Sequence, residues 1–344
     1  MFFIADVGSC HNGSLERAKE LIRLSKKVGA NAAKFQSWQT DKFISSVVFE
    51  ELENIVEKSH QDKWEKSVYE TYKKYELPLA WIPELKSECD KNKIEFMCSV
   101  YTLEDLDYID KFVNIHKIGS GKITDYKFIE ATAKKNKPVL LATGASTLPE
   151  VIDAVNIIER FNRNIVIMQC NTCYDSNRDN ENQVNLNVLK SYKTYFPNYG
   201  IGLSDHTKNL SIIQESITLG ASFIERHITD SQNNSPDNSF ALSEIEWKYM
   251  IDNCIDTLKH LGNTYKTVTQ NELETRILQR ECLMANKDLP KDHILTDDDI
   301  ISMRPCPQDG VPPFINLIGM KLSRPIKKHD YFRAELLEIK NEKK

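Results

Sequence analysis

The sequence lacks any apolar run of the roughly 18 to 20 residues that a membrane-spanning helix needs. Its N-terminus, MFFIADVGSC, has no charged start and becomes polar within a few residues, so we predict a buried first strand and not a signal peptide. A basic excess is also lacking, because 45 Lys and Arg stand against 50 Asp and Glu, a formal net charge of -5. We therefore expect no membrane partner and no nucleic-acid partner, whereas small anionic substrates remain compatible with local cations.

The cysteines do not form a disulfide framework. Eight of them are dispersed through 344 residues, which is typical of reduced thiols in a cytosolic protein with a proper core. Cys170 and Cys173 form a CxxC, but a single CxxC is weak evidence for zinc, and Cys170 is explained by packing at the end of a strand. We therefore expect a cytoplasmic protein without disulfides.

No GxGxxG motif follows the first predicted strand, which argues against a doubly wound dinucleotide-binding sheet. Instead, eight β-branched or apolar runs each end in a polar cluster and are followed by helix-period sequence, the pattern of a parallel sheet with crossover helices. The runs are Phe2–Val7, Ala32–Phe35, Glu95–Val100, Ile115–Ile118, Pro138–Ala142, Ile165–Cys170, Gly200–Leu203 and Ser222–His227. The first crossover helix can be capped by Ser14 and ended by Gly29. These features predict a (β/α)8 TIM barrel.

The rest of the chain suggests three further segments. Residues 40–93 form an insertion rich in aromatic and charged residues, with helices of its own. The polar stretch TDSQNNSPDNS after the eighth strand is predicted to be a loop over the barrel mouth. We predict that the barrel spans residues 1–262, that a charged linker spans 263–280, and that 281–344 form a small module of short strands and turns.

Polar residues at the strand ends predict a single site, because these ends meet at the C-terminal face of a TIM barrel. They are Asp6, Lys34, Gln36, Ser99, Lys117, Ser120, Thr143, Asn171, Thr172, Ser204, His206, Glu225 and His227. Two lysines, several hydroxyls and glycine-flanked turns such as IGSGK and LATGAS suit a doubly charged phosphate beside a carboxylate. Phosphoenolpyruvate satisfies that description.

A metal site is predicted by two histidines. His206 and His227 end adjacent strands, within GLSDHT and IERHITD, so their rings can approach one another. A pair of neutral imidazoles with open positions suits a divalent metal, and we expect Mn²⁺, with Mg²⁺, Fe²⁺, Co²⁺ or Zn²⁺ as alternatives. Asp205 and Glu225 beside them are either partners that orient the imidazoles or ordinary charges at the barrel rim.

Several motifs together resemble one known family. IADVGSCHNGSLERAKELI, GANAAKFQS, HKIGSGKITD, LLATGAS, GLSDHT and IERHITD, in this order and spacing, resemble the sialic acid synthase family, which includes the N-acetylneuraminate, legionaminate and pseudaminate synthases. LMANKDLPKDHILTDDDIISMRP and IGMKLSRPIKKHDYF are similar to the family's C-terminal antifreeze-like (SAF) domain. The resemblance covers nearly the whole chain. It implies a metal-dependent condensation of phosphoenolpyruvate with an aldose, giving a 3-deoxy-2-ulosonic acid, in a domain-swapped homodimer.

The resemblance also implies roles for individual residues. Those matching the phosphoenolpyruvate site are Lys34, Ser99, Lys117, Ser120, Thr143, Thr172 and Ser204. The implied catalytic residues are Asp6, Gln36, Lys122, Asp237 and Arg304, and the implied metal ligands are His206 and His227. Tyr174, Asp237 and Arg304 match positions that face the acceptor sugar, and Arg304 would reach the site of the partner subunit.

The chain departs from the family pattern at several of these positions. Asp6 and Lys122 replace glutamates, Ala142 replaces a serine, Thr172 replaces an asparagine, and CPQDGVPP replaces a shorter glycine-rich turn beside Arg304. Since several of these positions line the acceptor side, we expect an acceptor other than the ordinary N-acetylmannosamine.

Two other functions stay open at this point. One is a Schiff-base aldolase that uses Lys34 or Lys117 as nucleophile on a pyruvate-like substrate. The other is a catalytically inert sugar-phosphate binder, a reading that Lys122 and Ala142 motivate.

Overall fold

The structure, a computed structural model, describes residues 1–52, 61, 64, 66–174, 181–230 and 235–338. The chain divides into two compact units, Met1–Gly262 and Asn263–Lys344. Within the described ranges, no helix combines the length and the apolar composition that a membrane crossing requires.

The first unit is a barrel of eight parallel strands. They are β1 Phe2–Asp6, β2 Ala32–Ser37, β3 Glu95–Val100, β4 His116–Ile118, β5 Val139–Ala142, β6 Ile165–Cys170, β7 Gly200–Ser204 and β8 Phe223–His227. The strand order is β3-β2-β1-β8-β7-β6-β5-β4, and β3 contacts β4 where the sheet closes. Each strand lies within two residues of its predicted bounds, which confirms the (β/α)8 fold.

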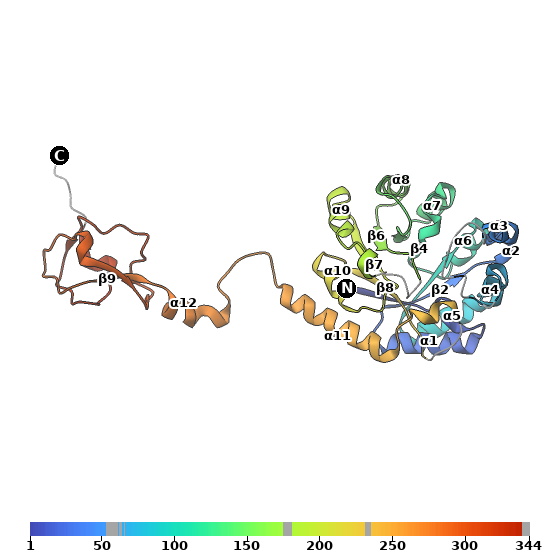
Figure 1. Cartoon of the computed structure of the whole chain (residues 1–344), viewed down its shortest axis with the longest axis horizontal. Helices are drawn as coiled ribbons and strands as arrows, with labels where there is room; N and C mark the ends of the chain where they lie inside the picture. Colours follow the sequence, from blue (N-terminus) through green and yellow to red (C-terminus); the bar gives the residue numbers. More distant parts are fainter. Residues whose placement is uncertain (53–60, 62–63, 65, 175–180, 231–234, 339–344) are drawn as a thin grey trace. The chain divides into compact units, whose positions relative to one another are not determined.

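Helices surround the strands, as Figure 1 shows. They are α1 Leu15–Lys27, α5 Ile82–Asn92, α6 Leu103–Ile109, α7 Tyr126–Lys134, α8 Leu148–Glu159, α9 Val188–Tyr195, α10 Ser211–Thr218 and α11 Glu244–Leu261. The first of them has the predicted ends, because the side chain of Ser14 accepts a hydrogen bond from the backbone N of Arg17 and Gly29 has a φ of +94°. Its buried residues include Ala18 and Leu21, which pack towards the sheet.

Alternation along the strands places an apolar layer beneath a polar mouth. The apolar layer is a buried cluster of Ile4, Ala32, Met97, Leu140, Val166 and Met168. Successive side chains of a strand point to opposite sides, so a residue two positions further along points inward again. Such steps lead from Ile4 to Asp6, from Ala32 to Lys34 and from Met97 to Ser99. The strands therefore become polar on their inner side as they reach the C-terminal face.

The described part of the insertion between β2 and β3 packs beside the ends of these strands. It contains α2 Thr40–Phe43, α3 Ser46–Leu52 and α4 Val68–Lys74; residues 53–60, 62, 63 and 65 lie outside the described ranges. Trp38, which follows β2, donates from Nε1 to the carbonyl oxygen of Tyr72 (3.1 Å), and the two rings meet with centroids 5.4 Å apart. The insertion thereby brings aromatic side chains to the barrel mouth.

The second unit has a small core of its own. It contains α12 Leu273–Gln279, which lies within the predicted linker, and the strands β9 Cys282–Ala285, β10 Ile300–Met303, β11 Lys321–Leu322 and β12 Leu337–Glu338. β9 pairs with β10 and β11 with β12, both antiparallel. Leu295, Leu317, Leu322 and Phe332 are among its buried residues. The likeness of this unit to an SAF domain stays a prediction.

Candidate active site

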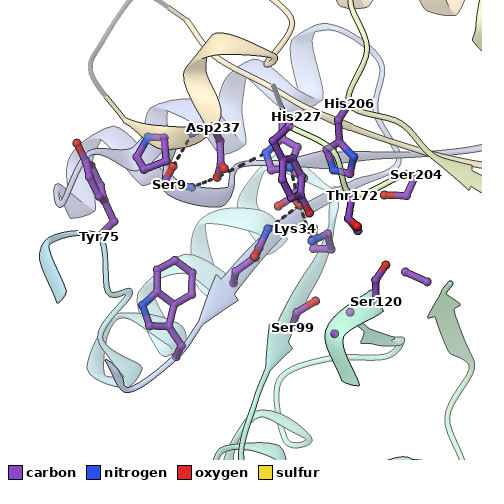
Figure 2. Close-up of a pocket in the computed structure, with 18 of the residues that line it drawn as sticks. Ser9, Lys34, Tyr75, Ser99, Ser120, Thr172, Ser204, His206, His227 and Asp237 are labelled. Carbon is purple, nitrogen blue, oxygen red and sulfur yellow. Dashed lines mark hydrogen bonds and ion pairs between the residues drawn. The ribbon is translucent and has the colours of Figure 1, made fainter. Parts of the chain in front are cut away.

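A cavity of about 300 Å³ opens at the C-terminal ends of the strands. It is lined by most of the predicted site residues: Asp6, Lys34, Gln36, Ser99, Lys117, Ser120, Thr172, Tyr174, Ser204, His206, His227 and Asp237. Figure 2 shows the two histidines above Lys34, with Ser204 and Thr172 beside His206 and with Ser99 and Ser120 below them. The expectation that the strand ends build one site thus agrees with the arrangement of these side chains.

Four buried charges form the base of the cavity. Lys34 Nζ lies 2.6 Å from Asp6 Oδ2 and 3.7 Å from Glu225 Oε1. Lys117 Nζ lies 2.7 Å from the same Glu225 oxygen. Buried ion pairs keep their geometry, because separating the two charges would leave each of them buried without a partner, at a high cost in free energy. The two ammonium groups are therefore fixed side by side.

The charges of this cluster are maintained by one another. Burial alone would lower the pKa of Lys34, but Asp6 and Glu225 offset this and raise it above its usual value. Burial alone would raise the pKa of each carboxyl, but the lysines hold both pKa values below their usual range. Because a Schiff-base nucleophile must lose its proton, Lys34 is poorly suited to that role.

The imidazoles of His206 and His227 lie together, with ring centroids 5.4 Å apart. Burial, followed by the proximity of His227, lowers the pKa of His206 to about 4, so this ring is neutral at pH 7. Its Nδ1 lies 3.0 Å from the carbonyl oxygen of Asn171, which assigns the proton to Nδ1 and leaves a lone pair on Nε2. Among the described residues, the buried Nδ1 of His227 has no hydrogen-bond partner.

Asp237 and Ser9 join two loops above the histidines. Asp237 Oδ2 accepts from the backbone N of Ser9 (2.7 Å), and Ser9 Oγ accepts from the backbone N of Asp237 (3.1 Å). The same Oδ2 lies 3.8 Å from Nδ1 of His227. Asp237 belongs to the polar stretch predicted to lie over the mouth, of which residues 231–234 lie outside the described ranges.

Gly8 allows this close approach, and it gives a first prediction. Its φ is +46°, and a Cβ there would stand 2.2 Å from Asp237 Oδ2 and 2.9 Å from the His227 ring. We expect Gly8→Ala to displace both side chains and to lower turnover at least tenfold, measured as product formed per folded protein. Gly13→Ala is the matched control, because Gly13 also has a positive φ (+74°) but open space around it, the nearest atom being 3.6 Å away. Both variants carry the backbone cost of about 1–2 kcal/mol, so equal activities would contradict the role of Gly8.

The hydroxyl side of the cavity is built around Gly144. Its backbone N donates to Ser120 Oγ (2.9 Å), and a Cβ at this position would stand 2.4 Å from Thr172 Cγ2. Ser204 Oγ donates to Glu225 Oε1 (3.1 Å), which ties this side to the charged base. Hydroxyls and a backbone turn thus lie beside two lysines, an arrangement suited to phosphate oxygens.

Three predicted residues of the barrel, Lys122, Thr143 and Asn171, do not line this cavity. Asn171 donates from its side-chain amide to the carbonyl oxygen of Gln183 (3.0 Å). Lys122 turns away, because its ammonium pairs with Asp125 Oδ2 (2.7 Å) and lies over the ring of Phe128 (4.8 Å). Thr143 donates from its hydroxyl to the carbonyl oxygen of Met168 (2.9 Å) and accepts from Tyr192 (2.8 Å), outside the cavity lining. Arg304 belongs to the second unit, where it donates to Gln279 Oε1 (3.3 Å).

An aromatic wall that the sequence did not predict completes the cavity; it consists of Trp38, Phe43, Tyr72 and Tyr101. The ring of Phe43 lies 4.2 Å from that of Tyr101 and 5.9 Å from that of Tyr72, centroid to centroid. Tyr101 donates to Gln36 Oε1 (3.0 Å), and Gln36 donates to Asp6 Oδ2 (2.9 Å). A usable signal was present, since Tyr101 directly follows β3 and Trp38 directly follows β2.

Comparisons with known proteins identify the family of the chain. The NeuB family matches residues 21–266 of the chain. The chain belongs to the NeuB family. This NeuB-family chain is 30% identical to a pseudaminic acid synthase from Campylobacter jejuni, over 95% of the chain and 93% of that protein. It is 29% identical to an N,N'-diacetyllegionaminic acid synthase from the same species, over 96% of the chain and 98% of that protein.

A solved structure supports the fold of the NeuB-family chain. The N-acetylneuraminic acid synthetase of Leptospira borgpetersenii superposes with a TM-score of 0.68 at 24% identity, covering 80% of this chain and 89% of that one. The resemblance to the sialic acid synthase family that the motifs indicated is thereby confirmed for the family and for the barrel.

Proposed function

We propose that this chain condenses phosphoenolpyruvate with an aldose to give a nonulosonic acid of the sialic acid type, with release of phosphate. The observation that carries the proposal is one cavity in which a pair of imidazoles lies beside two buried ammonium groups and several hydroxyls. Such a cavity offers separate places for a carbonyl oxygen and for an enol phosphate. The named synthases among the relatives, which match nearly the whole chain, support this reaction class.

The residues of the charged side would bind and orient phosphoenolpyruvate. Lys34 and Lys117 would hold its carboxylate and phosphate oxygens, and the hydroxyls of Ser99, Ser120 and Ser204 would donate to them. C3 of the bound enol would then attack the aldehyde carbon, water would add at C2, and the C2–O bond to phosphate would break. The buried ion pairs keep both ammonium groups in place throughout these steps.

The two histidines fit a divalent cation, with Mn²⁺ as the expected ion. The lone pair on Nε2 of His206 and Nδ1 of His227, which has no hydrogen-bond partner among the described residues, are nitrogens of the kind that such ions bind. Within the described ranges no group of three His, Cys, Asp or Glu is arranged around a single ion, so oxygens of substrate or water would complete the coordination. A cation held there would supply Lewis-acid polarisation of the aldehyde.

The acceptor is proposed to differ from N-acetylmannosamine. Tyr174 and Asp237 face the space in front of the histidines, and the aromatic wall bounds the cavity beyond Gln36. Lys122, which stands where the family has a glutamate, is neutralised by Asp125 and offers no carboxylate to the sugar. An acceptor with apolar faces or substituents suits such a lining.

The test is a phosphate-release screen with phosphoenolpyruvate against C5 and C6 aldoses and their N-acylated and 6-deoxy derivatives, with and without a chelator. We expect chelator-sensitive release with at least one acceptor. A covalent adduct after borohydride reduction with pyruvate would support the aldolase instead. Binding of phosphoenolpyruvate without release across the whole panel would support the inert binder.

A shared site in a homodimer is a further part of the proposal, and it yields a second prediction. The second unit exposes Phe314 (83%) and Ile318 (52%), as expected of a surface that packs against another subunit. We expect Arg304→Ala to lower turnover, because an arginine that reaches the partner's cavity would bind substrate oxygens. Mixing this variant with His206→Ala, a barrel variant that is expected to stay folded, should restore part of the activity in mixed dimers. Absence of complementation would argue against a shared site.

A further inference from the structure

Arg226 lies in β8 between Glu225 and His227, the two residues that this strand turns towards the cavity. Because successive side chains of a strand alternate, Arg226 points to the other side of the sheet. Its side chain is completely buried (0% exposed). A guanidinium in such a place is stable only with partners, so the identity of these partners indicates its role.

The groups in contact with the Arg226 guanidinium belong to the two residues that flank His206, and the carboxylate of Glu246 is a further charge in its surroundings. Its Nη1 forms an ion pair with Asp205 Oδ2, and its Nη2 donates to the carbonyl oxygen of Thr207. Asp205 in turn accepts from the backbone N (3.2 Å) and the hydroxyl (3.0 Å) of Thr207. The backbone N of Asp205 donates to the carbonyl oxygen of Glu225 (3.1 Å). A closed set of bonds therefore holds the backbone on both sides of the His206 imidazole.

We propose that Arg226 is a positioning residue that fixes residues 205–207 and so holds the imidazole of His206 beside that of His227. The planar fork of the guanidinium suits this task, since it binds a carboxylate and a carbonyl in one fixed geometry. Strand β8 then carries the imidazole of His227 itself, and through Arg226 it also fixes the position of the His206 imidazole. From the sequence, Asp205 could be either a group that orients the imidazole or an ordinary charge at the barrel rim. In this proposal the buried Asp205 is the orienting group.

The consequence for metal binding rests on the proposed function, whereas the positioning itself does not. A ligand whose supporting residues are removed loses its orientation, and metal affinity typically falls by about 10- to 100-fold. We expect Arg226→Met to weaken Mn²⁺ binding within this range. Arg226→Lys, which keeps the charge but loses the fork, should lie between it and the unmodified chain. The affinity for phosphoenolpyruvate should change little, because Lys34 and Lys117 are untouched.

The experiment measures hydrogen–deuterium exchange of residues 205–207 and Mn²⁺ affinity by calorimetry, both in the full chain. Faster exchange at 205–207 in Arg226→Lys, with weaker Mn²⁺ binding, is the expected result. Ile224→Ala is the matched control, since Ile224 is a buried residue on the same side of the same strand and its side chain donates no hydrogen bond. This control should lower the melting temperature without raising exchange at 205–207.

Several outcomes would overturn the proposal. One is a folded Arg226→Lys variant in which residues 205–207 exchange at the same rate as in the unmodified chain. Another is an increase in the exchange rate of residues 205–207 in Ile224→Ala that equals the increase in Arg226→Lys. Should both Arg226 variants fail to fold, Asp205→Asn keeps the side-chain shape while weakening the ion pair, and unchanged exchange in that variant would overturn it too. If the unmodified chain bound no Mn²⁺, the metal part of the proposed function would fail, and the exchange data would still decide the role of Arg226.

Discussion

His206→Ala is expected to abolish metal-dependent turnover while the barrel stays folded. The imidazole lies at a strand end and faces the cavity, and its bond to the carbonyl oxygen of Asn171 is a single hydrogen bond of about 1 kcal/mol. Loss of the ligand would remove several kcal/mol of transition-state stabilisation, a fall in turnover on the order of 1000-fold or more.

The measurement is phosphate release over a titration of Mn²⁺, with the melting temperature recorded for each protein. His260→Ala is the matched control, because His260 is exposed near the end of α11 and faces no cavity residue of the site. It should retain full activity. Undiminished turnover in His206→Ala would defeat the metal assignment.

Lys117→Met is the second variant with a large expected effect, because it removes binding and stability together. Its ammonium lies 2.7 Å from Glu225 Oε1 in a buried setting. Without it, Glu225 keeps the hydrogen bond from the Ser204 hydroxyl (3.1 Å) and the longer contact to the ammonium of Lys34, at 3.7 Å. Removing one partner of a buried pair costs about 3–5 kcal/mol, so we expect a clear fall in the free energy of unfolding. Binding of phosphoenolpyruvate should be lost as well.

A double variant separates these two effects. Lys117→Met with Glu225→Gln leaves no uncompensated carboxylate, so most of the stability should return, as measured by chemical denaturation. Binding of phosphoenolpyruvate, measured by calorimetry, should not return, because the ammonium group is still absent. If binding recovered together with stability, Lys117 would be a structural residue and not a substrate ligand.

The barrel and the base of its cavity could be predicted because both follow from local patterns. Eight apolar runs separated by helical periods define the strands, and the topology then forces their C-terminal ends together. His206 and His227 could be paired in advance for this reason alone. The alternation of side chains along a strand would also have corrected the prediction for Thr143. Leu140 points inward, so Ala142 points inward and Thr143 does not.

Other features depend on contacts that no local pattern contains. The direction of Lys122 is set by Asp125 and by the ring of Phe128, which offer its ammonium a partner away from the cavity. The aromatic wall depends on packing between side chains from three separate segments of the chain. Trp38 and Tyr101 could have been placed at the mouth because they directly follow strands, but their contacts with Phe43 and Tyr72 could not be predicted from period or composition. Arg226 has no signal at all in the sequence, because its role becomes visible only when its buried partners are known.

The carboxylates among the cavity residues have a consequence for how substrate arrives. Among the described lining residues, Asp6, Glu225 and Asp237 outnumber Lys34 and Lys117, and the whole chain carries a formal net charge of -5. Without the divalent cation, an approaching phosphoenolpyruvate trianion therefore gains no long-range attraction from this entrance. A cation held by the two histidines would add two positive charges and reverse this balance. We therefore expect lower salt to accelerate capture of phosphoenolpyruvate only when the cation is bound.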